Sequence, residues 1–235
     1  MLSPTLLKLL FEKLHHAFDL DHLKELTFEA NPATFNLEKA KLFKQLGITR
    51  ISLGIQSFDN AILKTLGREH SREEALATVP LLREAGIPEI NIDLMFAIPG
   101  QSLESWEDTL RTAISLGSDH ISAYNLTYEE DTAFIDKLTS GEYNDDPETN
   151  AQYVTLADSL RTEAGFKHYE TSNYAKPNKQ STHNLSYWDG SAYLGLGPSA
   201  VSTISNTRWK NTPDTARYIS QINHTGHAQT EIENL

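Results

Sequence analysis

Polar side chains interrupt apolar segments that otherwise have the composition of buried strands. They are Glu29 in segment 26–32, Gln56 in segment 51–58 and Asp93 in segment 90–100. Carboxylate and amide oxygens accept hydrogen bonds from an ammonium group or from hydroxyls. An amphipathic helical pattern follows each segment, so we predict parallel strands that end in these polar residues at one rim of a sheet. That rim is where α/β barrels keep their chemistry.

The elements that must position these side chains alternate between strand and helix up to residue 127. We expect a helix at 3–18, strands at 26–30, 48–56, 89–97 and 119–126, and further helices at 37–46, 59–66, 72–84 and 103–116. Glycines such as Gly47, Gly86 and Gly117 follow the helical patterns, as is common at helix ends. Repeated βα units with right-handed crossovers predict an α/β fold, a partial (β/α) barrel of TIM type.

The pattern changes beyond residue 127. Helices are expected at 131–141, 147–164 and 213–222, short strands near 167–171 and 200–204, and a loop at 183–188. We therefore predict a barrel domain at 1–128 and a smaller α+β region at 129–235, with the boundary inside 128–146.

Composition excludes several classes of function. The chain has 20 basic and 32 acidic residues, a formal net charge of -12, which argues against nucleic-acid partners and anionic membranes. No apolar run approaches the roughly 20 residues that span a bilayer, and the start at Met1 lacks a signal-peptide pattern, so a cytoplasmic location is expected. Cysteine is absent, and no thiolate metal site is predicted within this chain.

Several short motifs occur in order along nearly the whole chain. They are Phe28-Glu-Ala-Asn-Pro, Gly54-Ile-Gln-Ser-Phe, Leu66-Gly-Arg, Asp93-Leu-Met-Phe-Ala-Ile-Pro-Gly-Gln and His183-Asn-Leu-Ser-Tyr-Trp. Together they resemble the radical S-adenosylmethionine (SAM) proteins related to oxygen-independent coproporphyrinogen III oxidase. The resemblance is strongest to the haem-chaperone branch of that family.

The resemblance implies three cofactors for the complete family: SAM, a [4Fe–4S] cluster and haem. Family members hold the cluster in a Cys-x3-Cys-x2-Cys loop and contact SAM through a Gly-Gly-Gly-Thr-Pro strand end. The family pattern resumes in this chain at Leu2-Ser3-Pro4, after both motifs. We therefore expect a fragment that lacks the first two βα units and cannot hold the cluster by itself.

The resemblance also assigns SAM contacts residue by residue, to Glu29, Gln56, Arg68, Asp93 and Ala123. A guanidinium suits the SAM carboxylate, so Arg68 is expected there, and Asp93 is expected on a ribose hydroxyl. The division of roles between Glu29 and Gln56 stays open, and Ala123 would act through its backbone. The competing interpretation makes Glu29 a helix-capping acid and Arg68 a surface residue.

His183 is the candidate haem residue. The motif in which it lies marks the chaperone branch, and Tyr187, Trp188 and Tyr193 offer flat apolar surface that suits a porphyrin. A histidine in such a segment can equally be a hydrogen-bonded structural residue.

Three functions follow from these observations. The first is a haem-binding chaperone that passes haem to an apo-haemoprotein acceptor. The second is an oxygen-independent coproporphyrinogen III oxidase, which decarboxylates propionate side chains in porphyrin biosynthesis. The third is a non-enzymatic α/β module that binds another small ligand. No catalytic residue is assigned, and whether the protein is an enzyme stays open. The acidic chain favours the chaperone, because propionate substrates attract arginine and lysine.

Overall fold

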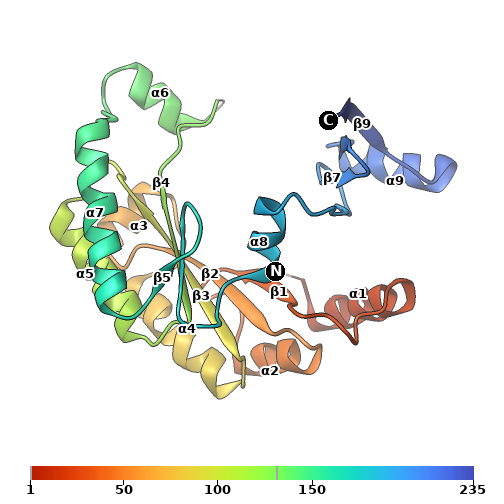
Figure 1. Cartoon of the computed structure of the whole chain (residues 1–235), viewed down its shortest axis with the longest axis horizontal. Coiled ribbons are helices and arrows are strands. Elements are labelled where there is room, and N and C mark those ends of the chain that lie inside the picture. The colour runs from red at the N-terminus through yellow and green to blue at the C-terminus, as the bar shows by residue number, and fades with distance from the viewer. Residues whose placement is uncertain (1, 131) are drawn as a thin grey trace. The chain divides into compact units, whose positions relative to one another are not determined.

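The computed structural model describes residues 2–130 and 132–235, shown as a ribbon in Figure 1. Asp131, the expected start of a helix, lies outside the described residues. The chain forms two compact units, the first ending at Thr182 and the second spanning His183–Leu235.

A mixed sheet forms the centre of the first unit (Figure 1). Its strands are β1 (Thr27–Ala30), β2 (Arg50–Gln56), β3 (Glu89–Phe96), β4 (His120–Asn125), β5 (Lys167–His168) and β6 (Asn173–Ala175), in the order β1-β2-β3-β4-β6-β5. Strands β1 to β4 are parallel, whereas β6 runs antiparallel to β4 and to β5. The predicted α/β fold with a partial barrel is confirmed.

Helices precede, connect and follow the parallel strands in the expected order. They are α1 (Pro4–Ala17), α2 (Leu37–Gln45), α3 (Asn60–Thr65), α4 (Arg72–Glu84), α5 (Leu103–Ser115), α6 (Ala133–Thr139) and α7 (Pro147–Glu163). Local sequence explains their starts: Ser3, Asn36 and Asp59 each accept a backbone N–H at the N-cap, and Ser71 forms a capping box with Glu74. In Figure 1, α4, α5 and α7 lie along the outer side of the sheet.

The two faces of the sheet differ in chemistry. Side chains that point toward the helices form the core, among them Ile51, Leu53, Ile90, Ile92 and Ile121, all fully buried. Alternate residues point to opposite faces of a strand. The opposite face therefore carries the residues between them, which are polar: Arg50, Ser52, Asn91, Asp93, His120, Ser122 and Tyr124. We call this set the polar face.

The first unit extends to Thr182, past the boundary predicted inside 128–146. Helix α7 is held against α5, because Trp106 Nε1 donates to the Tyr153 carbonyl at 3.0 Å and the Tyr153 hydroxyl donates to the Gln101 carbonyl at 2.6 Å. Strand β6 then pairs with β4. The change of pattern near residue 128 therefore marks a change from parallel to antiparallel connections within one unit.

The second unit combines helices with a small antiparallel sheet. Its elements are α8 (Thr182–Trp188, which begins at the last residue of the first unit), β7 (Val201–Ile204), β8 (Thr207–Asn211), α9 (Thr215–Thr225) and β9 (Gln229–Asn234), with the strands in the order β7-β8-β9. The prediction of a loop at 183–188 was wrong, because this segment forms α8. None of the helices within residues 2–130 and 132–235 combines the length and apolar composition that a bilayer crossing requires.

Candidate functional site

Of the candidate SAM residues that lie on strands, Asp93 belongs to the polar face, where its neighbours come from adjacent strands. The register places Gly54 of β2 beside Asp93 of β3, and Asp93 beside Ser122 of β4. One step toward the amino ends, Ser52 pairs with Asn91, and Asn91 with His120. Polar side chains from neighbouring strands thus form rows across the sheet instead of a single rim.

Asp93 lies inside β3 and not at its end, which corrects the position expected from the sequence. Its carboxylate accepts from Ser52 Oγ at 2.7 Å and from Asn91 Nδ2 at 2.6 Å. Burial raises the pKa of Asp93, and the charge of Glu29 adds to the rise, although the hydrogen bonds oppose it. The carboxylate is therefore held in one orientation by side chains from two strands.

Gln56 closes β2 in a strained backbone conformation. Its φ is 70°, a left-handed value that non-glycine residues seldom adopt, and it follows an irregularity in the pairing of β2 with β3. The side chain is 8% exposed, and its Oε1 accepts from the Tyr124 hydroxyl at 2.7 Å. Tyr124 was not singled out in the sequence, but it orients the amide of a candidate site residue.

Arg68 follows α3 and reaches back over β2. Its Nη2 donates to the Gly54 carbonyl and, at 2.6 Å, to Asn31 Oδ1. A Cβ at Gly54 would lie 2.8 Å from Asn31 Oδ1 and 3.1 Å from Arg68 Nη2. Glycine at this position therefore lets the guanidinium approach the strand backbone at the polar face.

Glu29 and Ala123 differ from the other candidates. Glu29 is exposed on β1, where it pairs in register with Ser52. Ala123 is 6% exposed, its side chain belongs to the apolar core, and its N–H donates to the Ser172 carbonyl at 2.9 Å. The side chain of Ala123 is thus separate from the polar face, and a contact of its backbone with SAM stays a prediction.

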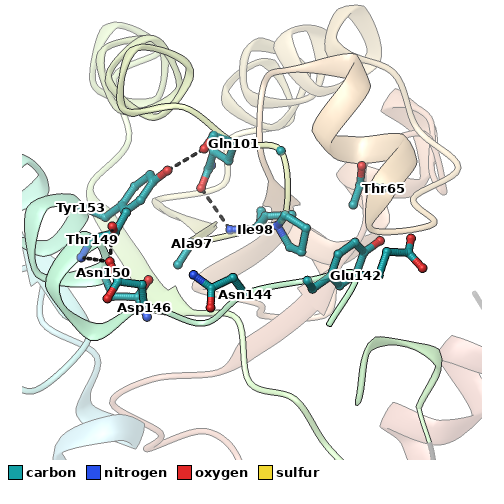
Figure 2. Close-up of a pocket in the computed structure, with 13 residues that line it drawn as sticks. Thr65, Ala97, Ile98, Gln101, Glu142, Asn144, Asp146, Thr149, Asn150 and Tyr153 are labelled. Carbon is teal, nitrogen blue, oxygen red and sulfur yellow. Dashed lines mark hydrogen bonds between the residues drawn. The ribbon is translucent and has the colours of Figure 1, made fainter. Parts of the chain in front are cut away.

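A cavity of 520 Å³ lies at the carboxyl end of β3, beside α7 (Figure 2). The loop 97–101 forms one wall, and residues 142–153 contribute another. Gln101 supports that loop, since its Oε1 accepts from the Ile98 N–H at 3.4 Å while its carbonyl accepts from the Tyr153 hydroxyl (Figure 2). None of the candidate residues from the sequence lines this cavity.

His183 belongs to the second unit. It is exposed on α8, and its ring packs edge-on against Tyr187 with centroids 4.9 Å apart. Tyr187 in turn contacts Tyr193 at 4.7 Å, whereas Trp188 is 61% exposed. Tyr187 and Tyr193, two of the three aromatic residues expected from the sequence, therefore form a row of ring contacts that begins at His183.

The chain's residues fit the family cofactors to different degrees. No group of three or more His, Cys, Asp or Glu side chains that could hold a metal occurs among the described residues. Because the sequence has no cysteine, the chain provides no thiolate for a [4Fe–4S] cluster. The kinds of group that SAM requires are present, since Asp93 on the polar face and Gln56 beside it can accept hydrogen bonds and Arg68 carries a positive charge. An exposed imidazole such as His183 suits haem iron.

Comparison with known sequences identifies the family. Residues 1–113 match the sequence model of the Radical SAM superfamily. The Bacillus subtilis protein "Heme chaperone HemW" is 36% identical over 205 residues, which are 87% of this chain and 54% of that protein. The Danio rerio protein "Radical S-adenosyl methionine domain-containing protein 1, mitochondrial" is 37% identical over 84% of this chain and 45% of its own length. The chain spans about half the length of these curated relatives.

Solved structures agree on the fold. The coproporphyrinogen III oxidase HemN from Escherichia coli, described as a radical SAM enzyme, superposes with a TM-score of 0.84 at 23% identity, covering 100% of this chain and 57% of HemN. The Elp3 protein of Methanocaldococcus infernus gives a TM-score of 0.51 at 26% identity, over 60% of this chain and 32% of Elp3. The chain belongs to the HemW and HemN-like group of the radical SAM proteins.

Proposed function

We propose that this chain is part of a haem chaperone of the HemW type, which binds haem and passes it to an acceptor haemoprotein. Support comes from relatives named "Heme chaperone HemW", which are 33% identical in Lactococcus lactis and 38% identical in Haemophilus influenzae. Haem, the acceptor and a cytoplasmic location all stay predictions for this protein; one relative is named mitochondrial.

In this proposal SAM binds at the polar face. The observation that carries it is the orientation of Asp93, whose carboxylate is fixed by Ser52 and Asn91 on a partly buried surface. A preorganised acceptor of this kind suits a ribose hydroxyl. Arg68 supplies the cation for the SAM carboxylate, and Glu29 and Gln56 supply acceptors for its ammonium group. Ala123 contributes through its backbone.

Haem binds in this proposal through His183. A neutral imidazole ligates iron, and Tyr187 and Tyr193 provide aromatic surface beside it for the porphyrin. The residues of this chain do not fit the [4Fe–4S] cluster, because they include no cysteine.

Coproporphyrinogen oxidation is the alternative function, and charge on the polar face weighs against it. A substrate with several propionates needs several basic partners. Arg50 is only 2% exposed and already donates to Glu89 at 2.6 Å, with Glu25 at 3.6 Å from its Nε. Arg68 likewise already donates to the Gly54 carbonyl and to Asn31 Oδ1. Turnover of coproporphyrinogen III by the full-length protein with SAM and a reductant would favour the oxidase.

Haemin titration tests the chaperone proposal directly. The purified chain should show a saturable, red-shifted Soret band that weakens in the His183→Ala variant. His15→Ala is the matched control, since His15 is also an exposed helical histidine, on α1. Equal haem affinity in the two variants would remove His183 from the haem site. Transfer of haem to an added apo-haemoprotein should be seen as loss of this Soret band and appearance of the Soret band of the acceptor.

A further inference from the structure

A buried hydrogen-bond chain leads away from Asp93 across the polar face. Asn91 Nδ2 donates to Asp93 Oδ1 at 2.6 Å, and Asn91 Oδ1 lies 2.6 Å from His120 Nδ1. His120 Nε2 lies 2.7 Å from the Tyr169 hydroxyl, which accepts from the Ser181 N–H at 3.3 Å. These hydrogen bonds therefore connect β3 and β4 to the segment that precedes α8.

The acceptor at Asp93 determines which group donates in each of these hydrogen bonds. Because Asp93 Oδ1 accepts from the Asn91 amide nitrogen, the amide oxygen of Asn91 faces His120. His120 Nδ1 is then the donor, which leaves Nε2 as an acceptor for the Tyr169 hydroxyl. The order of groups thus specifies a single histidine tautomer.

The surroundings of His120 favour the neutral ring that this direction requires. His120 is 1% exposed, and burial, with the positive charge of Arg50 as a second cause, lowers its pKa to about 3. A neutral ring in a buried network keeps both nitrogens satisfied, one as donor and one as acceptor.

We propose that Asn91 and His120 are positioning residues for the Asp93 carboxylate, with His120 held as the neutral tautomer that carries its proton on Nδ1. The inference rests on the proposed function, in which that carboxylate binds the ribose of SAM. In this role His120 acts through Asn91: it holds the amide oxygen of Asn91, whose nitrogen donates to Asp93 and also to Ser52 at 2.6 Å.

Nitrogen-15 NMR of histidine-labelled chain tests the tautomer. The His120 signals, identified by their loss in the His120→Asn variant, should show a protonated Nδ1 and an unprotonated Nε2. Protonation on Nε2 alone, or on both nitrogens at neutral pH, would overturn the inference. This readout needs neither SAM nor haem.

Two substitutions of His120 separate positioning from simple support of the fold. An asparagine amide places a donor near the Nδ1 position, whereas a glutamine amide reaches the Nε2 position. SAM affinity should therefore stay within about twofold in His120→Asn and fall about tenfold in His120→Gln, a factor that corresponds to the loss of one hydrogen bond. Equal affinities in the two variants would overturn the positioning role.

Asp93→Ala distinguishes failure of this inference from failure of the SAM site. If Asp93→Ala weakens SAM binding while the two His120 variants behave alike, the positioning role fails and the SAM site stands. If Asp93→Ala leaves SAM binding unchanged, the SAM site and the positioning role fail together. Should His120→Gln not fold, the tautomer of the unmodified chain decides.

Discussion

The candidate SAM residues and the candidate haem residue differ in how firmly the surrounding structure holds them. Asp93 lies within a strand, and its carboxylate is oriented by side chains from β2 and β3. His183 lies on α8, a helix with no buried residue, and contacts a tyrosine ring. Sites on packed strands are held more precisely than sites on exposed segments. The polar face is therefore formed before its ligand arrives, whereas haem would complete the surroundings of His183.

Of the substitutions that test this difference, Arg50→Ala should have the largest effect, on the free energy of unfolding. Arg50 is 2% exposed and pairs with Glu89 and Glu25, so Arg50→Ala removes the buried cation beside these carboxylates, of which Glu89 retains Lys179 at 3.0 Å. We expect the free energy of unfolding to fall by about 3 kcal/mol, measured by chemical denaturation. The control is Arg111→Ala, which breaks an exposed pair with Glu107 on α5 and should change the same quantity by less than about 0.5 kcal/mol. Similar losses in both variants would show that the polar-face pairs do not support the sheet.

The next effect concerns SAM affinity. Arg68→Ala removes the guanidinium held over Gly54 and should weaken SAM binding to the full-length protein by about 2 kcal/mol, through loss of a charge-assisted pair. Calorimetric titration measures the change. Lys64→Ala is the matched control, because Lys64 is an exposed cation on the preceding helix. Unchanged affinity in Arg68→Ala would assign this residue to support of the loop alone.

A pH dependence of stability should come from His120. Its pKa is about 3 in the folded chain, against 6.5 for an unperturbed histidine, so between these values the unfolded chain binds more protons. Stability is therefore full above pH 6.5 and falls as the pH drops toward 3. The raised pKa of Asp93 acts in the opposite direction. Between these pH values, the denaturation midpoint should change less with pH in His120→Asn than in the unmodified chain. An equal change with pH in both proteins would contradict a buried neutral His120.

The sequence allowed much of the first unit to be predicted, because local signals agree with the packing there. The capping box at Ser71 and the glycine at Gly86 enclose α4, whose observed bounds of Arg72–Glu84 match the prediction. The alternation of polar and apolar residues in β3 could also be recognised in the sequence, since Asn91 and Asp93 alternate with isoleucines. Applied along the whole of β3 and β4, the same alternation would have found Asn91, His120 and Tyr124.

The parts that were missed depend on contacts distant in sequence. Strand β6 covers only Asn173–Ala175, too short for a periodic signal, and its pairing with β4 extends the first unit. The start of α8 is fixed by Glu25, whose carboxylate accepts from the Thr182 N–H at 2.7 Å. A capping acid this far away in the chain leaves no local pattern. The segment 183–188 was therefore expected to be a loop.

The smallest expected effect is on stability at His183. Because this side chain is exposed and its contact is a ring packed against Tyr187, His183→Ala should lower the free energy of unfolding by less than about 0.5 kcal/mol. Chemical denaturation without haem measures it, beside the haemin titration of the same variant. A loss as large as that of Arg50→Ala would make His183 a structural residue. The difference between the firmly held polar face and the exposed surroundings of His183 would then not hold.

A crystal structure of the full-length protein with SAM tests the central claim most directly. The account predicts a ribose hydroxyl within about 3 Å of the Asp93 carboxylate and the SAM carboxylate paired with Arg68. The bonds from Ser52 and Asn91 to Asp93 should be unchanged from those described above. SAM bound away from the polar face, with Asp93 still bonded only to Ser52 and Asn91, would contradict the account.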